Sequence, residues 1–533
     1  MIFRGGLVEP RELFRLGDLP LAVHGEVLFS AAAVAHEETP LVSVCIDSRQ
    51  CREGSLFVAL PGACTDGHRH VGDALSRGAV AAVVSTREDP LSGQEWSLPV
   101  VCVQDTLVAL HQLAGWYCRT HLAGIFRIGV TGSNGKTTTK EMIAAILRCA
   151  GPTSASFGNL NSETGVPLAL FQTDREARYA VYEMAMSNPG EMVALADMVR
   201  PDLAVITNIG VAHIGNLGSQ EAIAREKKAI ASCFDGSQSL LVPEDDPFCT
   251  FLQEGVSGQV LTFGVESQKA SFEAGDEPGE QRICVEGEWY TLPLEGAHNG
   301  RNALAAVAVA RVLEIGADCL HQGFRTLRLP SGRSEVLQGR EGILILNDSY
   351  NANPESCHAA LETVASLHAQ RLHRGDAGAG SHLVLILGEM AELGSATVSG
   401  HRSVLERAIS LGPALVLLVG ALDREGPGAE ESAWDRLEQD QAELFHRECR
   451  VLRFASVEDV LAQGVLLPQG ALLAGGETLL LKGSRSAGLE LLLPSLVDPD
   501  PAGAGPVTAS NPEAPEAAPS FHHPLKPEAS DDA

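Results

Sequence analysis

Short apolar runs alternate with amphipathic stretches along most of the chain, and many of the apolar runs end in a polar cluster. The clearest case is Ile125–Thr131, which leads through a loop with two glycines into an amphipathic stretch over residues 141–148. Alternation of short strands with helices is typical of α/β domains. In such domains ligands bind at the carboxyl edge of the parallel sheet. We therefore predict an α/β protein whose functional residues follow its strands.

The apolar runs fall into three groups, and a chain of 533 residues is too long for one hydrophobic core at about 150 residues per domain. We predict a small α/β module over residues 1–118, a central P-loop ATPase domain with a parallel sheet over 119–328, and a Rossmann-like domain over 329–497. The last of these lacks a GxGxxG fingerprint. Residues 498–533 are rich in proline, alanine, serine and acidic groups, which predicts a disordered tail. Within 235–290, glycine and charged residues indicate an antiparallel edge or subdomain.

The charge balance narrows the class of partner. The chain has 39 lysines and arginines against 68 aspartates and glutamates, which gives a formal net charge of −29. Nucleic acids and anionic membrane surfaces need a basic face on the protein, so we expect neither as a partner. Small anions are still possible ligands, because local groups can hold them.

Cysteine spacing and hydropathy indicate the compartment. The 12 cysteines are scattered with no CxxC spacing, which predicts reduced, mostly buried thiols. The first residues lack the apolar segment of a signal peptide, and no apolar run in the sequence reaches the ~20 residues needed to span a bilayer. We therefore expect a cytoplasmic protein that is not an integral membrane protein.

The loop after the first strand described above has the composition of a phosphate cradle. In such a loop the backbone N–H groups face the anion, Lys136 reaches the β- and γ-phosphates, and the Thr137 hydroxyl ligates Mg²⁺. The strict pattern has glycine where this chain has Val130, so the loop is a GxxGKT variant in which Gly132 supplies the turn. The alternative is a surface glycine loop, but the Lys-Thr pair falls at the strand–helix junction that the mechanism requires. The predicted ATP contacts in this loop are Gly132, Ser133, Asn134, Gly135, Lys136, Thr137 and Thr138.

Two further strand ends carry candidate metal ligands. Glu183 ends the β-prone run 179–182, and His213 follows the run 203–208. Because parallel strands end at one edge of a sheet, Thr137, Glu183 and His213 are expected to meet there. Together with phosphate oxygens and waters, these side chains suit Mg²⁺. Taken singly, Glu183 is more typical of a helix cap and His213 of a loop histidine.

Four polar residues further along the chain leave two interpretations open. Asn299 and Asn302 lie three residues apart on one face of a predicted helix. Their amides can bind the edge of an adenine, or they can only cap the helix. Arg333 can contact a γ-phosphate and Asp348 a ribose, but each can also be an ordinary turn or surface charge.

Two pairs of residues also have a purely structural interpretation. Ser48 and Arg49 follow a predicted strand, where the arginine can clamp a phosphate or carboxylate. With Asp47 they can equally cap and pair at a turn. Lys227 and Lys228 lie on a predicted helix, and their pattern alone indicates solvated charges.

Together these segments resemble the Mur ligases, ATP-dependent amide-forming enzymes of peptidoglycan assembly, from about Val44 to Leu493. Tyr350–Pro354 favours the branch of the family that joins D-alanyl-D-alanine to UDP-N-acetylmuramoyl-tripeptide (UDP-MurNAc-tripeptide). The Asp-Asn-Pro-Arg sequence of many diaminopimelate-adding members is absent. The other stretches that carry the resemblance are Asp47–Arg49, Leu56–Leu60, Asp66–His68, Thr131–Thr138, Gly158–Pro167, Glu183–Met184, Thr207–Asn208, Ala212–His213 and Leu387–Met390.

The resemblance implies a mechanism and a set of site residues. The tripeptide carboxylate attacks the γ-phosphate of ATP, and the amine of D-alanyl-D-alanine then displaces phosphate from the acyl phosphate. Such chemistry needs positioning and charge neutralisation more than a protein nucleophile. The resemblance also implies two Mg²⁺ ions, one on Thr137 and Glu183 and one on His213 and a carbamylated Lys227. The remaining implied contacts are Lys136 with the phosphates, Asn299 and Asn302 with adenine, Arg333 with the γ-phosphate, Asp348 with the ribose, Ser48 and Arg49 with the uridine nucleotide, and Asn161 with the region of the peptide.

Two other functions stay open at this point. A ligase of the same family can add a diamino acid to UDP-MurNAc-dipeptide instead. A nucleotide-binding scaffold that no longer ligates is the second alternative, and the intact phosphate and Mg²⁺ residues argue against it. Many family members have glycine where this chain has Ala185, a departure that leaves the phosphate and Mg²⁺ positions untouched. We expect the chain to act as a monomer.

Overall fold

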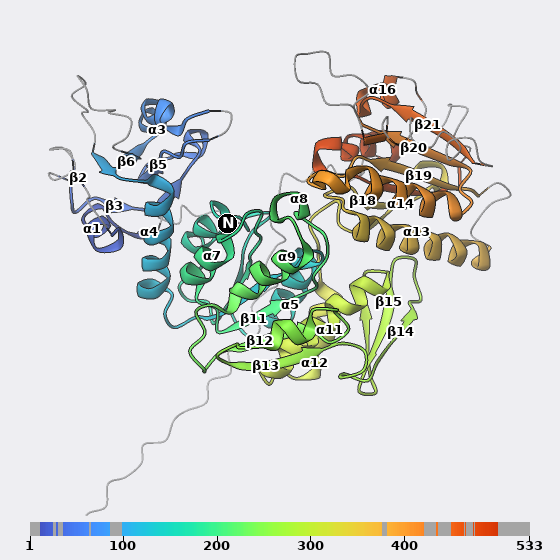
Figure 1. The fold of residues 1–533 in the computed structure, drawn as a ribbon, viewed down its shortest axis with the longest axis horizontal. Helices are drawn as coiled ribbons and strands as arrows, with labels where there is room; N and C mark the ends of the chain where they lie inside the picture. The colour runs from blue at the N-terminus through green and yellow to red at the C-terminus, as the bar shows by residue number, and fades with distance from the viewer. Residues whose placement is uncertain are drawn as a thin grey trace, which may run out of the picture. The chain divides into compact units, whose positions relative to one another are not determined.

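The sheets and helices that position the site lie between residues 11 and 498 (Figure 1). The computed structural model describes residues 11–24, 28–29, 36–62, 65–85, 99–375, 381–420, 433–434, 437, 449–462, 464, 473 and 475–498. The first ten residues, and the predicted tail beyond Asp498, lie outside these ranges. No helix within them has both the length and the apolar character that crossing a membrane requires.

A six-stranded parallel sheet forms the core of the central domain. The strand order is β13-β12-β11-β8-β10-β9, and every neighbouring pair is parallel. The parallel sheet predicted for this part of the chain is therefore confirmed. Its strands are β8 (Phe126–Thr131), β9 (Thr153–Ala155), β10 (Tyr179–Glu183), β11 (Leu203–Ile206), β12 (Ser239–Pro243) and β13 (Gln259–Phe263).

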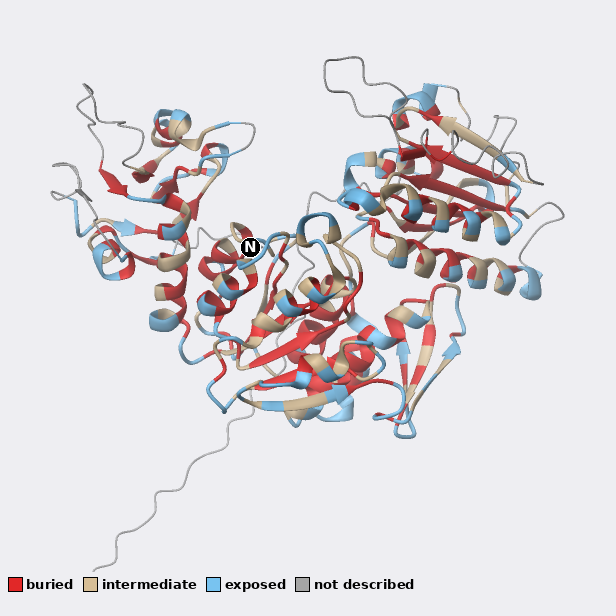
Figure 2. Cartoon of the chain, viewed as in Figure 1, coloured by how far each residue is buried: buried red, intermediate tan, exposed pale blue. Residues whose placement is uncertain are grey.

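Alternate residues of this sheet pack into two separate cores, because side chains of a strand point to opposite faces in turn. On β10, Tyr179 and Val181 join one core, while Ala180 and Tyr182 join the other. Central strands such as β10 and β11 are buried on both faces (Figure 2), which explains their continuous apolar sequences. The first face is covered by α5 (Lys136–Ala150), α11 (Ala297–Val312) and α12 (Ala317–Thr326), and the second by α4 (Thr106–His121), α6 (Gly165–Phe171), α7 (Glu191–Val199) and α9 (Gln220–Lys228).

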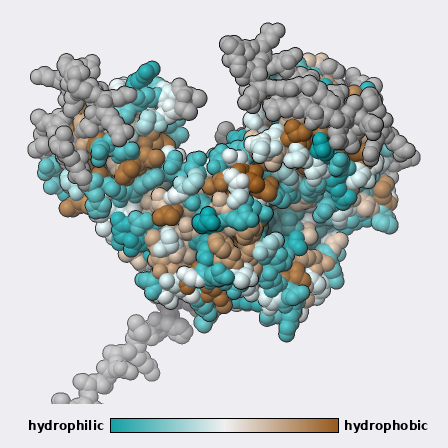
Figure 3. Space-filling view, viewed as in Figure 1, coloured by the Kyte–Doolittle hydropathy of each residue, from teal (hydrophilic) through white to brown (hydrophobic). Residues whose placement is uncertain are grey.

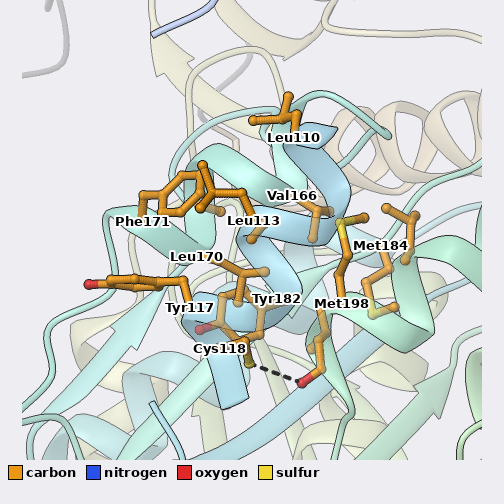
Figure 4. Packing of buried hydrophobic residues seen from close by; sticks show 14 of the residues in the cluster. Leu110, Leu113, Tyr117, Cys118, Val166, Leu170, Phe171, Tyr182, Met184 and Met198 are labelled. Carbon is orange, nitrogen blue, oxygen red and sulfur yellow. Dashed lines mark hydrogen bonds between the residues drawn. The ribbon is translucent and has the colours of Figure 1, made fainter. Parts of the chain in front are cut away.

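Figure 4 shows the core on the second face. Tyr117 of α4, Leu170 of α6 and Tyr182 of β10 lie in one cluster of buried side chains. Nearer its N-terminus, α4 contributes Leu110, which belongs to the same core as Val101 of the N-terminal sheet and lines a small cavity with it. Each fully buried side chain of this size contributes about 1.5–3 kcal/mol. Helix α4 therefore joins the sheet of the N-terminal module to the central domain through one apolar core.

A separate antiparallel sheet follows the central strands. It consists of β14 (Ala270–Ala274), β15 (Gln281–Val285) and β16 (Glu288–Leu292). The antiparallel subdomain predicted within 235–290 is confirmed for these strands. The prediction is wrong for β13, which pairs in parallel with β12. An edge strand such as β13 is buried only in part, so its sequence resembles that of an antiparallel strand.

The N-terminal module is built on a five-stranded sheet in the order β2-β7-β6-β5-β4. Only β2 is antiparallel to its neighbour. Its elements are β2 (Leu28–Phe29), β4 (Ser43–Cys45), β5 (Ser55–Val58), β6 (Ala79–Ser85), β7 (Val100–Val103) and α3 (Val71–Ser76), with α1 (Leu19–Ala22) and the ladder of β1 (Phe14–Arg15) with β3 (Pro40–Leu41) alongside.

The C-terminal domain has a six-stranded sheet in the order β17-β18-β22-β19-β20-β21, in which only β17 is antiparallel. Its elements are β17 (Glu335–Gln338), β18 (Leu344–Asp348), β19 (Leu383–Gly388), β20 (Leu415–Val419), β21 (Arg450–Phe454), β22 (Thr478–Lys482), α13 (Pro354–Arg374), α14 (Thr397–Ser410), α16 (Val457–Ala462) and α17 (Leu493–Leu496). Two short helices of the central domain, α8 (Ile214–Leu217) and α10 (Cys249–Gln253), complete the described helices. The prediction of three α/β domains is confirmed, while their boundaries at 118, 328 and 497 stay predictions.

Cys149 of α5 and Cys319 of α12 form a disulfide across a sequence separation of 170 residues. The prediction of reduced thiols is wrong for this pair. Sequence spacing could not reveal it, because the two cysteines come together only when α5 and α12 pack on the same sheet face. Nine other cysteines among the described residues are free, and five of these are buried.

The described surface is mainly hydrophilic. On the face shown in Figure 3, hydrophilic side chains cover much of the central domain, with small apolar patches between them. This distribution is ordinary for a folded protein, whose surface always retains some apolar atoms.

Candidate active site

A cavity of about 790 Å³ lies between the carboxyl edge of the central sheet and residues of the C-terminal domain. The P-loop, the residues after β10 and β11, and the first turn of α11 form its central side. Its position at the strand ends agrees with the expectation for a parallel sheet. The predicted site residues that line it are Ser133, Asn134, Gly135, Lys136, Thr137, Thr138, Asn161, Glu183, His213, Asn299, Asn302, Arg333 and Asp348.

Two glycines allow the P-loop to take its path. Gly132 has a φ of 150° and Gly135 a φ of 77°. A Cβ atom on Gly132 would lie 1.8 Å from Thr207 Oγ1, and one on Gly135 would lie 2.3 Å from Asn302 Oδ1. Neither position therefore accepts a side chain. Val130, where the strict pattern has glycine, is still a buried residue of β8, so the turn begins only after the strand has ended.

The end of β11 holds the P-loop in place. Asn208 accepts a hydrogen bond from Asn134 N at 3.0 Å, and its Nδ2 donates to Asn134 O at 3.1 Å. Thr207 Oγ1 donates to the same carbonyl at 2.5 Å. Gly210 N donates to Ser133 Oγ at 2.8 Å. These bonds fix the loop backbone next to the N-terminus of α5, where a phosphate is favoured.

Thr137 and Glu183 meet at the base of the cavity, as the strand order predicts. Thr137 Oγ1 donates a hydrogen bond of 2.6 Å to Glu183 Oε2, and Asn161 Nδ2 donates one of 2.7 Å to Glu183 Oε1. Thr137 and Glu183 are 1% and 2% exposed. Glu183 is the last residue of β10 and not a helix cap. Asn161, expected in the region of the peptide, also contacts a predicted Mg²⁺ ligand.

The residues at the base of the cavity fit a magnesium ion. Mg²⁺ is commonly held by one or two carboxylates together with substrate phosphates and waters. In the part of the chain that the structure describes, no group of three or more His, Cys, Asp or Glu side chains is arranged to hold a metal. An ion on Thr137 and Glu183 would therefore take its other ligands from phosphates and waters.

Two lysine ammonium groups share one backbone carbonyl behind the P-loop. Lys136 Nζ donates to Gly132 O at 2.9 Å, and Lys227 Nζ donates to the same oxygen at 3.0 Å. Lys227 is 1% exposed. Burial, and then the charge of Lys136, hold the pKa of Lys227 well below its ordinary value. The reading of Lys227 as a solvated charge is therefore wrong.

The neighbouring Lys228 has a different environment. Its Nζ donates to the carbonyls of Phe251 and Glu254 and lies 4.5 Å from the centre of the Phe251 ring. Lys228 thus packs against α10 and does not line the cavity. Of the two adjacent lysines, only Lys227 reaches the P-loop.

His213 lines the cavity and faces the C-terminal domain. Its Nδ1 lies 2.7 Å from Glu392 Oε2. The hydrogen bond and charge of His213 hold the pKa of Glu392 below its usual range. Both residues have a φ of 64°, in the left-handed region that non-glycine residues seldom adopt. Nothing in the sequence pattern singled out Glu392 as a partner of His213.

The first turn of α11 places two amides at the cavity. Asn299 is 1% exposed and its Nδ2 donates to Glu295 O at 2.8 Å, whereas Asn302 lies against Gly135 of the P-loop. The N-cap of α11 is Gly296, and no side chain caps this helix end. The alternative of helix capping is therefore wrong for both asparagines.

Arg333 and Asp348 line the C-terminal side of the cavity. The Arg333 guanidinium lies 3.9 Å above the centre of the Tyr350 ring. Asp348 accepts hydrogen bonds from Ser334 N at 2.8 Å and from Lys482 Nζ at 2.5 Å. Sequence reasoning did not assign Tyr350 or Lys482 to the site. Lys482 is identified only by the pairing of β18 with β22, which sets it opposite Asp348.

Two residues at the start of α13 contact the central domain directly. Asn353 caps α13 by accepting from Ser356 N, and its Nδ2 donates to Asn134 Oδ1 of the P-loop at 2.7 Å. Glu355 Oε1 accepts from Val211 N at 2.9 Å. Asn353 therefore caps α13 and also binds the P-loop. The sequence motif Tyr350–Pro354 did not by itself predict the second contact.

Ser48 and Arg49 are not among the residues that line the cavity. Asp47 caps the turn that contains them by accepting from Arg49 N, and the Arg49 guanidinium pairs with Asp47 at 2.7 Å. The Arg49 side chain is 81% exposed. The structure thus contains the cap and pair named as the alternative, and a role of these residues in substrate binding stays a prediction.

Comparisons with known proteins identify the family. Three family descriptions match: "Mur ligase family, catalytic domain" over residues 41–117, "Mur ligase middle domain" over 130–310 and "Mur ligase, glutamate ligase domain" over 332–485. The UDP-N-acetylmuramoyl-tripeptide–D-alanyl-D-alanine ligase of Treponema pallidum is 36% identical over 460 residues, which cover 85% of this chain and 93% of that protein. The protein of the same name in Bacillus subtilis is 33% identical over 87% of this chain and 94% of its own length.

Solved structures agree with this similarity. The crystal structure of MurF from Acinetobacter baumannii matches with a TM-score of 0.74 at 28% identity, over 90% of this chain and 97% of that chain. On the combined extent of these similarities, the chain belongs to the Mur ligase family.

Proposed function

We propose that this chain is an ATP-dependent ligase of the MurF type, which joins D-alanyl-D-alanine to UDP-MurNAc-tripeptide and produces UDP-MurNAc-pentapeptide. The observation that carries the proposal is the similarity to MurF proteins over nearly their whole length. The cavity residues support it, because Thr137 and Glu183 are in contact beside an intact P-loop. A scaffold that has lost ligation would not need to keep this pair.

The reaction proceeds by two displacements. A carboxylate oxygen of the tripeptide forms a bond to the γ-phosphorus of ATP while the bond to ADP breaks, which gives an acyl phosphate. The amine of D-alanyl-D-alanine then forms a bond to the acyl carbon and loses a proton, and inorganic phosphate leaves. Lys136 and the backbone N–H groups of the P-loop hold the phosphates, and Arg333 meets the γ-phosphate from the C-terminal domain. Asn299 and Asn302 bind the adenine, and Asp348 binds the ribose.

Thr137 and Glu183 would hold one Mg²⁺ ion, which would supply positive charge to neutralise the phosphates. His213 and a carbamylated Lys227 would hold a second ion. An uncharged amine is required for that modification, in which nitrogen forms a bond to CO₂ and a proton is released. Burial beside Lys136 favours the uncharged amine of Lys227. Carbamylation then converts the buried amine into an anion that would suit a metal ion.

The remaining parts of the proposal concern the substrates and the setting of the reaction. Ser48 and Arg49 bind the uridine nucleotide, and Asn161 lies at the boundary between the Mg²⁺ ligands and the peptide. The enzyme works in the cytoplasm, as a monomer, with no nucleic acid partner. Light scattering on the purified chain tests the monomer directly.

A phosphate-release assay with purified protein tests the function. With ATP and Mg²⁺ present, we expect release when UDP-MurNAc-tripeptide and D-alanyl-D-alanine are both added, and none when either is omitted. Mass spectrometry should find the pentapeptide product. Release only with UDP-MurNAc-dipeptide and a free diamino acid would instead identify the diamino-acid-adding branch. Repeating the assay with diaminopimelate and lysine tripeptides identifies the third residue of the peptide.

A further inference from the structure

One exposed arginine beside the cavity has no acidic partner. Arg485 follows β22 in the C-terminal domain, and no carboxylate within the described ranges forms an ion pair or hydrogen bond with its guanidinium. The side chain instead lies over an aromatic ring, with its guanidinium 5.3 Å from the centre of the Tyr350 ring.

The strand pairing explains why Arg485 lies at the site. Strands β18 and β22 are parallel neighbours, and Asp348 is paired with Lys482 at their ends. Tyr350 and Arg485 therefore follow the same point of the sheet edge. Tyr350 lines the cavity and also carries the Arg333 guanidinium at 3.9 Å from its ring centre. Two guanidinium groups thus share one tyrosine ring.

Several other cations at the cavity already have partners. Lys482 is paired with Asp348, Arg301 with Asp245, and Lys136 with two carbonyls of the P-loop. Arg333, like Arg485, has no carboxylate partner within the described ranges, and the proposed function assigns it to the γ-phosphate. Of the basic residues named here, Arg485 is the one whose guanidinium is left for another anion.

We propose that Arg485 binds the carboxylate of the incoming dipeptide. This inference rests on the proposed function and adds the group that selects the second substrate. The dipeptide amine must reach the acyl carbon, which forms where Arg333 meets the γ-phosphate. In an extended dipeptide the carboxylate lies ~7 Å further along the chain. Arg485 shares the Tyr350 ring with Arg333, and its fork geometry suits a carboxylate.

The test compares the natural dipeptide with D-alanyl-D-alaninamide, which keeps the amine but lacks the carboxylate. We expect kcat/KM of the wild-type enzyme to be about 10- to 100-fold lower for the amide than for the acid, the range of a charge-assisted hydrogen bond. In Arg485→Gln, kcat/KM for the acid should fall by a similar factor, and the value for the amide should not change. Arg485→Lys should fall between the two, since it keeps the charge and loses the fork.

Hydroxylamine allows a second test of Arg485, because this small amine traps the acyl phosphate without needing a carboxylate site. Hydroxamate formation and the KM for ATP should be the same in Arg485→Gln as in the wild type. Arg450→Gln, an exposed arginine at the amino end of β21, is the matched control for loss of a surface charge. Equal melting temperatures show that the Arg485 variants are folded.

Each outcome decides one question. Equal losses for the acid and the amide in Arg485→Gln, or a raised KM for ATP with slower hydroxamate formation, would overturn the assignment of Arg485. Failure of the wild-type enzyme to use D-alanyl-D-alanine at all would overturn the proposed function instead.

Discussion

The two sides of the cavity are built on different principles. On the central side, Thr137 and Glu183 are buried and hydrogen-bonded to each other, and the P-loop is held by the end of β11. On the C-terminal side, Arg333 and Arg485 stack on a half-buried tyrosine without carboxylate partners within the described ranges. The difference indicates that the phosphate side is organised before substrates bind. The C-terminal side keeps cations available for groups that the substrates bring.

Among these variants, loss of Lys136 should lower the rate of phosphate release the most. Lys136→Ala removes the charge that supports the phosphates in the transition state, and we expect phosphate release to fall by about 10³-fold or more. Lys228→Ala is the matched control, since Lys228 lies outside the cavity, and it should retain near wild-type turnover. A Lys136→Ala enzyme of near-normal rate would contradict a prearranged phosphate side.

Gly132→Ala tests whether the P-loop path is as rigid as its bonds suggest. A Cβ atom there would overlap Thr207 Oγ1, and the residue has a positive φ. We expect a loss of about 2–4 kcal/mol in the free energy of unfolding, together with loss of the rise in melting temperature that ATP gives the wild type. Denaturant titrations measure the first and thermal scans the second.

Gly72→Ala is the control for that variant, because a Cβ at Gly72 meets nothing within 4 Å and the residue lies within helix α3. It should leave stability unchanged or slightly raised. If both glycine variants behaved alike, the close approach of Thr207 would have no energetic consequence.

Lys227→Ala tests the buried lysine behind the P-loop. If the carbamate of Lys227 holds a metal ion, the variant should lose about 10²-fold in turnover. Short carboxylic acids such as formate and acetate should restore part of the activity by replacing the lost anion. The same acids should not rescue Lys136→Ala, where a cation is missing. Absence of rescue in Lys227→Ala would count against the carbamate.

The smallest expected effect concerns the pH dependence of folding stability, and it arises from one histidine of the C-terminal domain. His401 is fully buried; its Nε2 accepts from Met390 N at 3.0 Å and its Nδ1 lies 2.7 Å from Thr397 O. A proton on Nε2 would face the Met390 N–H, so the folded state needs the neutral ring. Burial lowers the pKa of His401.

The sign of this pH effect follows from proton binding. Below the ordinary histidine pKa of 6.5, the unfolded chain binds a proton that the folded chain does not. The folded state is therefore not penalised by this histidine above pH 6.5. Its stability decreases as the pH falls through that value toward the lowered pKa of His401 in the folded state. We expect the melting temperature of the wild type to fall more steeply below this pH than that of His401→Gln. Identical slopes would show that another group titrates.

The order of strands let the sequence predict much of the site. Thr137, Glu183 and His213 each follow a different apolar run, and parallel strands bring such positions to one edge. Asn161, Glu392 and Lys482 could not be placed in the same way. Their contacts join segments from separate parts of the chain, such as Asn161 with Glu183 and Lys482 with Asp348. Local pattern carries no information about which loops meet.

Local chemistry in the sequence determined the α/β class, the phosphate loop and the family resemblance, because periodicity and glycine placement act over a few residues. Tertiary structure alone decided the environment of each charge. Lys227 and Lys228 are adjacent and chemically identical, yet one is buried against the P-loop and the other packs on α10. Burial and neighbouring charges set the protonation of a lysine, and these depend on the packing of distant segments.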